Sequence, residues 1–406
     1  MISGHWAGLG LSGLGGTMHE LFARFPADVI AADAELAAGM AGDQLARGSL
    51  EEAERYLAVS ARALESVPAD QRGRPQIGLA SVRIRLARQR GDITAVAEEA
   101  QRLLAPAMAP GSDQPQLGGD LRALTLINLG IAELWTSRFD DADRHLEDGI
   151  ALARQIGRPY LEVTGLAYWA QLMSWRSFPL GAQRSLEAIE LAKQHGWADH
   201  PIAGVAYLAL GVAMVTQGRV EDAERALDQA ERTIRAEVDP AAGMRLVYGR
   251  GMLEFVSGHH DAALCAFQTA ERLATSLVNP HTLGPRLRSH LLQTLVRNGE
   301  TRRVEHALAG MDRPERDQGE IRIVEASLRL AQDDPRAATA VLAPVIDGSA
   351  PLQNAHLWDV QASGQRPRRR RPVRGLPHRL TDSGQGRKSL ATAGPGVVGS
   401  APWTGP

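Results

Sequence analysis

The sequence of 406 residues predicts an all-α fold in which pairs of helices stack into a solenoid. Three observations predict it: turn signals that recur along the chain, packing positions at fixed distances from each turn, and an aliphatic composition. Hydrophobic residues make up 44% of the chain but aromatic residues only 4%, so Ala, Leu, Ile and Val must form most of the core. These residues suit closely packed helices better than a sandwich of β-strands.

Turn signals recur at intervals of 34 to 46 residues, at Gly48, Gly91, Ser137, Ser177, Gly218, Gly258, Gly299 and Asp333. Acidic residues follow several of them, as in Gly218-Arg-Val-Glu-Asp-Ala223. Acidic side chains there complement the positive end of a new helix. The repetition predicts one helix pair per unit, and about eight pairs over residues 41–360.

Packing positions keep their distance from these turns. Seven residues before the turn stands a small residue: Ala41, Gly130, Ala170, Gly211, Gly251 or Ala326. Five residues after it stands Ala53, Ala142, Ala182, Ala223, Ala263 or Ala338. Four residues further on stands Leu57, Leu146, Leu186, Leu227, Phe267 or Leu342. Three beyond that stand Ala230 and Ala270, with Gly149 and Ile189 in weaker copies.

These positions indicate close helix packing. The small residue lets the first helix of a pair approach the second, whose Ala, Leu or Phe, and Ala residues form one stripe. Neither helix can bury its stripe alone, so successive pairs stack. A leucine at Gly211 should therefore overpack the pair and cost about 1–3 kcal/mol.

Composition sets the boundaries of the repeats. Residues 1–40 form a helical lead-in with one helical stretch, His19 to Phe25, which ends before Pro26. Polar loops over Ala105–Gly119 and Met311–Gly319 interrupt the repeats. Residues 361–406 have no helical periodicity and are expected to be disordered.

Charge divides the chain at the same boundary. Residues 361–406 contain nine basic groups and one acid, a net of +8, which leaves 36 basic and 46 acidic groups, a net of −10, for residues 1–360. An acidic body does not indicate a nucleic-acid surface. The run Arg368-Arg369-Arg370-Arg371 leaves a nucleic-acid arm open, but we favour a frameshifted tail, because the segment resembles GC-rich DNA translated in the wrong frame.

No motif indicates catalysis. Gly8-Leu-Gly10-Leu-Ser-Gly13 fits the dinucleotide pattern, but no strand–helix–strand alternation surrounds it. Neither lysine stands in a phosphate-binding loop, and His259-His260 lack further metal ligands. Cys265, the only cysteine, is interpreted as a small packing residue. We therefore expect no enzyme activity, no cofactor and no metal.

Binding is expected on the first helices of the central pairs, which line the concave face of such arrays. The candidate ligand-binding residues are Gln171, Arg245, Tyr248, Met252 and Phe255, with Thr164, Trp169 and Trp175 nearby. Packing between repeats is an alternative role for each aromatic residue. Arg245 and Gln171 are the stronger candidates, because burying them without partners is costly.

The spacings of twelve, four and three residues resemble the tetratricopeptide repeat, although most units here have about 40 residues. The resemblance implies a right-handed superhelix. The forty-residue units, the Arg/Ala/Leu-rich composition and the phrases Leu21-Phe-Ala-Arg-Phe-Pro-Ala-Asp28 and Ala34-Glu-Leu-Ala37 are one combination. It resembles, over roughly residues 1–360, the sensor region of large LuxR-family regulators, the maltose-activator-like signal-transducing ATPases. That resemblance implies a module that binds a protein or small-molecule inducer and controls a transcriptional regulator. The ATPase and helix-turn-helix motifs of the family are absent from this sequence.

Two other classes stay open. A stand-alone tetratricopeptide adaptor would bind a peptide or protein in the same groove, and an enzyme would need a cluster of titratable groups in a closed pocket. The single cysteine and the absence of a secretory signal or a long apolar run predict a cytoplasmic protein with no membrane partner.

Overall fold

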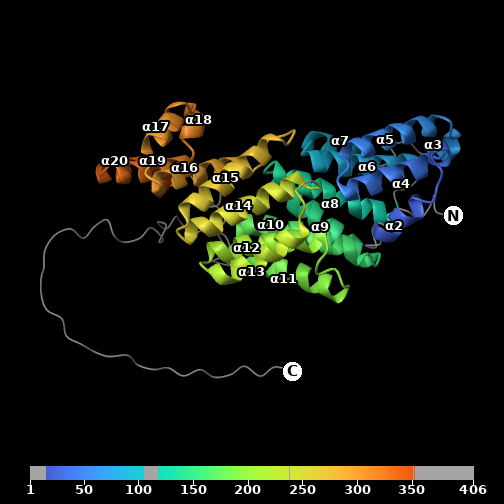
Figure 1. Ribbon diagram of the computed structural model, residues 1–406, viewed down its shortest axis with the longest axis horizontal. Coiled ribbons are helices and arrows are strands. Elements are labelled where there is room, and N and C mark those ends of the chain that lie inside the picture. Colours follow the sequence, from blue (N-terminus) through green and yellow to red (C-terminus); the bar gives the residue numbers. More distant parts are fainter. Residues whose placement is uncertain (1–14, 105–117, 237, 351, 353–406) are drawn as a thin grey trace, which may run out of the picture. The chain divides into compact units, whose positions relative to one another are not determined.

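A computed structural model describes residues 15–104, 118–236, 238–350 and 352, which all belong to one compact unit spanning residues 1–367 (Figure 1). Within these ranges the regular structure is helical, with no strand. The expectations for the Gly8–Gly13 motif, for most of the loop 105–119 and for the tail 361–406 lie outside the described residues. None of the described helices is long and apolar enough to cross a membrane.

Eight successive helix pairs make up most of the described chain. They are α4 (Ala34–Arg47) with α5 (Leu50–Glu65), α6 (Gly73–Arg90) with α7 (Ile93–Leu104), α8 (Gly119–Trp135) with α9 (Phe139–Gln155), α10 (Pro159–Arg176) with α11 (Phe178–Gln194), α12 (Pro201–Thr216) with α13 (Val220–Thr233), α14 (Pro240–Val256) with α15 (His260–Thr275), α16 (Gly284–Arg297) with α17 (Thr301–Ala309), and α19 (Gly319–Ala331) with α20 (Pro335–Ile346). The short helices η1 (Ala69–Gln71) and α18 (Arg313–Arg316) lie between pairs.

The lead-in contains more helix than the sequence predicted. Helix α2 (Gly15–Phe22) ends earlier than expected, and α3 (Ala27–Ala32) begins directly after Pro26. The Asp33 carboxylate then accepts hydrogen bonds from the backbone N–H groups of Glu35 (2.8 Å) and Leu36 (3.1 Å) and so caps α4. The prediction of a single helix before residue 40 is therefore wrong, because this cap was overlooked.

The turns within the pairs lie where the sequence placed them. Seven of the eight predicted turn residues adopt positive φ angles: Gly48, Gly91, Ser137, Gly218, Gly258, Gly299 and Asp333. This left-handed conformation is the usual way to end a helix, and glycine adopts it without steric cost. Ser177 is the exception. Its backbone is extended, and its hydroxyl accepts from the Leu180 N–H at 3.5 Å, so α11 starts directly after it.

The missing left-handed residue shifts the register of α11. Counted from the start of the second helix, Ser185 is equivalent to Leu227 in α13, and it is fully buried. Leu186, which the sequence assigned to this position, is 54% exposed. The assignment of Leu186 to the packing stripe is wrong, because one residue fewer in the turn rotates a helix by about 100°.

Close approach within the pairs is confirmed at three glycines. A Cβ atom on Gly130, Gly211 or Gly251 would lie 2.5 to 2.7 Å from a side-chain carbon of the partner helix. The partners are Leu146, Leu227 and Phe267, the large residues of the predicted stripe, and each is fully buried. The two helices can therefore pack this closely only because the small position has no side chain.

The segment 276–283 between α15 and α16 links distant pairs. Val278 and Asn279 donate backbone hydrogen bonds to the carbonyls of Arg90 (3.1 Å) and Gly91 (3.0 Å) in the α6–α7 turn. The Asn279 side-chain oxygen also accepts from the N–H groups of Ile93 (2.7 Å) and Thr94 (3.3 Å) and thereby caps α7. Figure 1 shows the end of α15 running toward α7 and α8. The sixth pair is thus tied to the second.

Candidate binding site

The five candidate residues divide into two groups. Gln171 on α10 and Arg245 on α14 are each only 8% exposed. The Arg245 guanidinium carbon lies 5.9 Å from the centre of the Tyr168 ring, and Tyr168 stands one helical turn before Gln171. The structure thus places Arg245 beside Tyr168, with Gln171 one turn further along α10; Tyr168 was not among the residues predicted from the sequence.

Tyr248, Met252 and Phe255 lie in a second, largely aromatic group. The Tyr248 ring centre is 5.8 Å from that of Phe267 and 5.6 Å from that of His290. The Tyr248 hydroxyl and His290 Nδ1 are 3.3 Å apart, and burial raises the pKa of Tyr248 to about 12. Met252 and Phe255 are half-buried against this group. These contacts join α14, α15 and α16, so a binding role for the three residues stays a prediction.

Tyr168 is held between two arginines from different helices. Arg88 of α6 donates from Nη1 to the Tyr168 hydroxyl at 3.0 Å, and its guanidinium carbon lies 5.9 Å from the ring centre, as does that of Arg245. The Asp239 carboxylate, which also caps α14, lies 3.5 Å from Arg88 Nη1. The Trp135 ring at the end of α8 lies 6.4 Å from the tyrosine ring and 5.5 Å from that of His281. We call this group the Tyr168 cluster; its members are Arg88, Trp135, Tyr168, Gln171, Asp239, Arg245 and His281.

The Tyr168 cluster contains an unusual number of buried atoms without partners. Nine buried side-chain nitrogen or oxygen atoms in the described part of the chain lack a hydrogen-bond partner, and five belong to this cluster. They are Arg88 Nε, Trp135 Nε1, Gln171 Nε2, Arg245 Nη1 and His281 Nε2. A buried polar group without a partner costs about 1–3 kcal/mol, so such a concentration requires an explanation.

All five of these atoms are donors. His281 Nδ1 accepts from the Leu283 N–H at 3.0 Å, so the neutral ring carries its proton on Nε2. Burial, followed by the nearby Arg245 charge, lowers the pKa of His281 to about 3, which keeps the ring neutral. Burial also lowers the pKa of Arg245, against the opposing effects of Tyr168 and Asp239. The cluster therefore presents N–H groups and positive charge.

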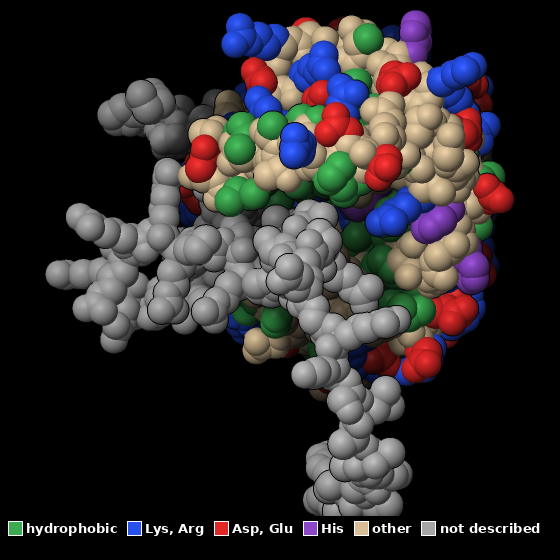
Figure 2. All heavy atoms as spheres, turned by 90° about the vertical axis from the view of Figure 1, so that its left-hand side faces the viewer, with side chains coloured by type: hydrophobic (Ala, Val, Ile, Leu, Met, Phe, Trp, Pro, Cys, Tyr) green, Lys and Arg blue, Asp and Glu red, His purple; other side chains and the backbone are tan. Residues whose placement is uncertain are grey.

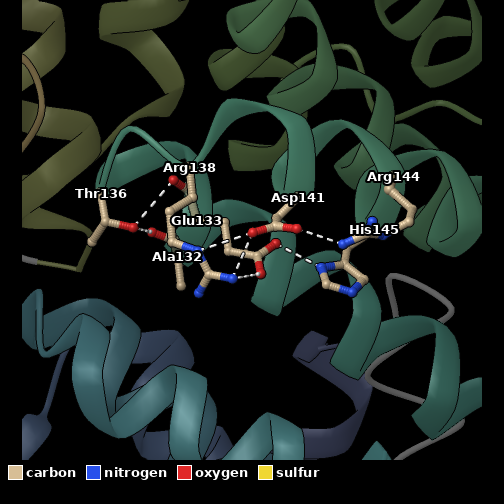
Figure 3. Close-up of polar contacts among 7 residues, drawn as sticks. All are labelled: Ala132, Glu133, Thr136, Arg138, Asp141, Arg144 and His145. Atoms are coloured by element: carbon tan, nitrogen blue, oxygen red, sulfur yellow. Dashed lines mark hydrogen bonds and ion pairs between the residues drawn. The ribbon is translucent and has the colours of Figure 1, made fainter.

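A buried carboxylate elsewhere shows the usual arrangement. Glu133 of α8 is 2% exposed, and burial raises its pKa, but its oxygens are well partnered. His145 Nδ1 lies 2.6 Å from one oxygen and Arg138 Nη2 lies 3.5 Å from the other (Figure 3). Asp141 in turn bonds both Arg138 and Arg144. This network lies within the α8–α9 pair and satisfies its own charges, whereas the Tyr168 cluster does not.

The other aromatic residues named from the sequence have partners of their own. Trp169 donates from Nε1 to Asp143 at 2.7 Å, and the Arg184 guanidinium carbon lies 4.5 Å from its ring centre. Trp175 lies beneath Arg286, at 4.3 Å, and beside Phe139, at 5.4 Å. These contacts are cation–π and aromatic packing within the solenoid.

Three further residues named from the sequence bond within their own helix or face solvent. The Thr164 hydroxyl donates to the Tyr160 carbonyl within α10. Cys265 is exposed, so the interpretation of it as a packing residue is wrong: two residues after the buried Ala263, it faces the other side of α15. His259 pairs with Glu254 at the surface, and among the described residues no group of three or more His, Cys, Asp or Glu side chains could hold a metal ion.

Charges of both signs are interspersed on the face shown in Figure 2. Many surface arginines pair with an acid three residues away, as Arg219 and Arg225 do with Asp222. Ion pairs between exposed side chains are screened by solvent and salt and contribute little to stability. On this face, positive charge is matched locally by negative charge, in contrast to the buried Tyr168 cluster.

Comparisons with known proteins establish the fold. Neither a protein-family model nor a curated protein sequence matches the chain. Among solved structures, the chain is similar to a Rap protein complexed with competence and sporulation factor, with a TM-score of 0.53 and 13% identity over 79% of this chain and 86% of that one. It is also similar to the apo form of RapI, with a TM-score of 0.43 and 10% identity over 86% of this chain and 96% of that one. At these identities the similarity to the first structure shows a shared fold: the chain is a tetratricopeptide-like helical solenoid.

Proposed function

We propose that this chain is a non-catalytic interaction module that binds a peptide or protein partner at the Tyr168 cluster. The observation that carries the proposal is Arg245, which is 8% exposed and whose Nη1 has no hydrogen-bond partner. A partner that filled this position would complete an arrangement that the described residues leave incomplete. The Rap protein with the same fold is complexed with a factor, which supports a binding role for solenoids of this kind.

One edge of the cluster is partly exposed. The side chains of Arg88 and Asp239 are 17% and 19% exposed, so solvent reaches the point where α6 meets the start of α14. Half-buried Arg85 stands one turn before Arg88 on the same helix. We therefore expect a ligand to reach the cluster from this edge.

The regulatory setting is a finer proposal. The resemblance at Leu21–Asp28 and Ala34–Ala37 favours the sensor region of a LuxR-type regulator, in which a protein or small-molecule inducer would occupy this site. Phe22 and Leu36 within these segments are buried, so core packing accounts for part of the resemblance. A phosphate-binding motif encoded upstream in the same frame and a helix-turn-helix encoded downstream would support it. Intact, unrelated neighbouring genes would favour a stand-alone cytoplasmic adaptor instead.

Peptide selection tests the binding proposal. Random peptides displayed on phage are selected on the immobilised full chain, and the dissociation constants of the selected peptides are measured by fluorescence anisotropy. We expect Arg245→Met to weaken binding at least tenfold. The matched control is Arg250→Met, because Arg250 lies on the same helix and pairs with Asp228 and Glu231 outside the cluster. Peptides that bind both variants as tightly as the unmodified chain, or a selection that yields none, would contradict the proposal.

A further inference from the structure

We infer that the Tyr168 cluster recognises a carboxylate of its ligand, bound by Arg245 together with the neighbouring N–H donors. The inference rests on the proposed function and adds the chemical class of the group that is recognised. It follows from the kind of atom left without a partner, from the charge balance and from the positions of the donors.

The unpartnered atoms specify an acceptor. All five are N–H groups, from two arginines, a tryptophan, a glutamine and a neutral histidine. Another amide or hydroxyl would bring donors of its own, whereas an ionised carboxylate is purely an acceptor with about four lone-pair directions. A carboxylate can therefore accept from more than one N–H donor without adding a donor of its own.

The charge balance specifies an anion. Arg88 lies 3.5 Å from Asp239, which accounts for one positive charge and one negative charge. Arg245 has no ion pair among the described residues, although it is more deeply buried than Arg88. Arg250, five residues further along α14, pairs with both Asp228 and Glu231. Since buried charges are normally paired, the cluster lacks one negative charge.

A single negative charge fits better than two. A phosphate group carries a charge of about −1.5 to −2 at neutral pH and would lie near the Asp239 carboxylate. Arg85, one turn before Arg88 on α6, is half-buried and interacts electrostatically with Arg88 and Tyr160, whereas Arg245 interacts with Tyr168 and Asp239. A carboxylate neutralises Arg245 without leaving an excess of negative charge beside Asp239.

Two of the donor groups already lie against the same ring. The guanidinium carbons of Arg88 and Arg245 both lie 5.9 Å from the Tyr168 ring centre, and the Arg88 hydrogen bond to the hydroxyl orients that ring. Gln171 stands between Tyr168 and Trp175 on α10, one turn from each. Planar guanidinium groups bind carboxylates through two parallel hydrogen bonds, and their fixed positions reduce the entropy lost on binding.

A ligand series tests the inference on the full chain. From the selected peptides, each acidic residue and the C-terminal carboxylate is replaced in turn by the corresponding amide, and one acidic position is replaced by phosphoserine. Affinities are measured by fluorescence anisotropy for the unmodified chain, for Arg245→Met and for Arg250→Met. Circular dichroism and thermal unfolding confirm that both variants are folded.

We expect one amide replacement to weaken binding at least tenfold to the unmodified chain and to Arg250→Met, but less than twofold to Arg245→Met. Because the peptide and the protein are each changed singly and together, this double-mutant cycle assigns the carboxylate to Arg245. Selected peptides that lose nothing on any amide replacement would overturn the inference and leave the proposed function standing. Tighter binding of the phosphoserine peptide would overturn the choice of carboxylate. Peptides that bind Arg245→Met as tightly as the unmodified chain would contradict both the binding role of the Tyr168 cluster and the recognition of a carboxylate there.

Discussion

The α12–α13 pair and the Tyr168 cluster are both buried, but the pair is packed from apolar side chains and the cluster contains polar side chains without hydrogen-bond partners. In the pair, Gly211 lies against Leu227, and Ala223 and Ala230 complete a contact in which the apolar side chains are fully buried. In the cluster, the buried side chains are polar and several of their donors lack partners. The first arrangement recurs along the chain because every pair must bury the same stripe. Among the described residues, the second arrangement is concentrated where helices from different pairs meet, as we expect of a binding site.

The largest effect is expected in the pair. Leu227→Ala removes a fully buried side chain from between two helices and should lower the free energy of unfolding by about 2–5 kcal/mol. Leu186→Ala is the matched control, because its side chain is 54% exposed, and it should change the value by no more than about 0.5 kcal/mol. Urea unfolding followed by circular dichroism measures both. Equal losses would mean that the register shift in α11 is wrong.

Overpacking the same interface should cost somewhat less. Gly211→Leu introduces a Cβ atom 2.7 Å from Leu227 Cγ and should cost about 1–3 kcal/mol. In Gly284→Leu, at the start of α16, the new Cβ would meet no atom within 4 Å, and we expect little change. An unchanged thermal midpoint for Gly211→Leu would contradict the close approach of α12 and α13.

The contact between distant pairs should contribute about 1 kcal/mol. Asn279→Ala removes the oxygen that caps α7 through the N–H groups of Ile93 and Thr94, and loss of a cap typically costs about that much. Hydrogen exchange should show faster exchange of these two amides. Asn298→Ala, which removes only a surface hydrogen bond to Asp261, should leave them protected. If both variants exchange alike, the segment 276–283 does not hold α7 in solution.

The cluster should also make stability depend on pH. Its folded form keeps His281 neutral down to about pH 3, whereas the ordinary pKa is 6.5, so the unfolded chain binds more protons between these values. The free energy of unfolding should therefore fall as the pH drops below 6.5, by up to about 1.4 kcal/mol per pH unit from this group. His281→Asn should have a flatter profile between pH 7 and 5, whereas His259→Asn, changed at an exposed turn, should parallel the unmodified chain. Parallel profiles for all three would show that His281 is not buried.

The smallest change in stability is expected for Arg245→Met, and comparing it with Arg250→Met tests whether Arg245 serves binding or stability. Arg245→Met replaces a buried charge without a partner by an apolar side chain of similar length, so stability should be unchanged or slightly higher. Arg250→Met removes two surface ion pairs and should cost about 0.5–1 kcal/mol, a small value because its partners are nearly half exposed. A loss for Arg245→Met larger than that for Arg250→Met would make Arg245 a structural residue.

The fold could be predicted from the sequence because its determinants are local. A left-handed turn, a small residue seven positions earlier and an apolar stripe after it recur together, and the structure confirms them in most units. The α10–α11 unit differs because Ser177 caps a helix directly; Ser177 followed by Pro179 in the first turn of α11 was a local signal of this cap and was missed. In the lead-in, the Asp33 cap was readable but was missed.

The site could be predicted only in part. Arg245 and Gln171 were found because long polar side chains at inward positions of helices are unusual. Arg88, Tyr168 and His281 were missed, because each becomes significant only through a contact with a different pair. Such contacts depend on how far the superhelix rotates between the second pair and the sixth, and periodicity within one repeat carries no information on that rotation.

The segment 276–283 also changes how the chain is expected to fold. In an open array each pair contacts only its neighbours, so stability is a sum of local terms and folding can start anywhere. The Asn279 contact joins residues 186 positions apart and closes the pairs from α6 to α15 into one loop. Those pairs should unfold together and form slowly, because a distant contact must be made before it stabilises anything. The helices before α6 and those from α16 to α20 lie outside the loop and should open before it. A chain shortened after the segment 276–283 should therefore still unfold the Tyr168 cluster together with the pairs of the loop.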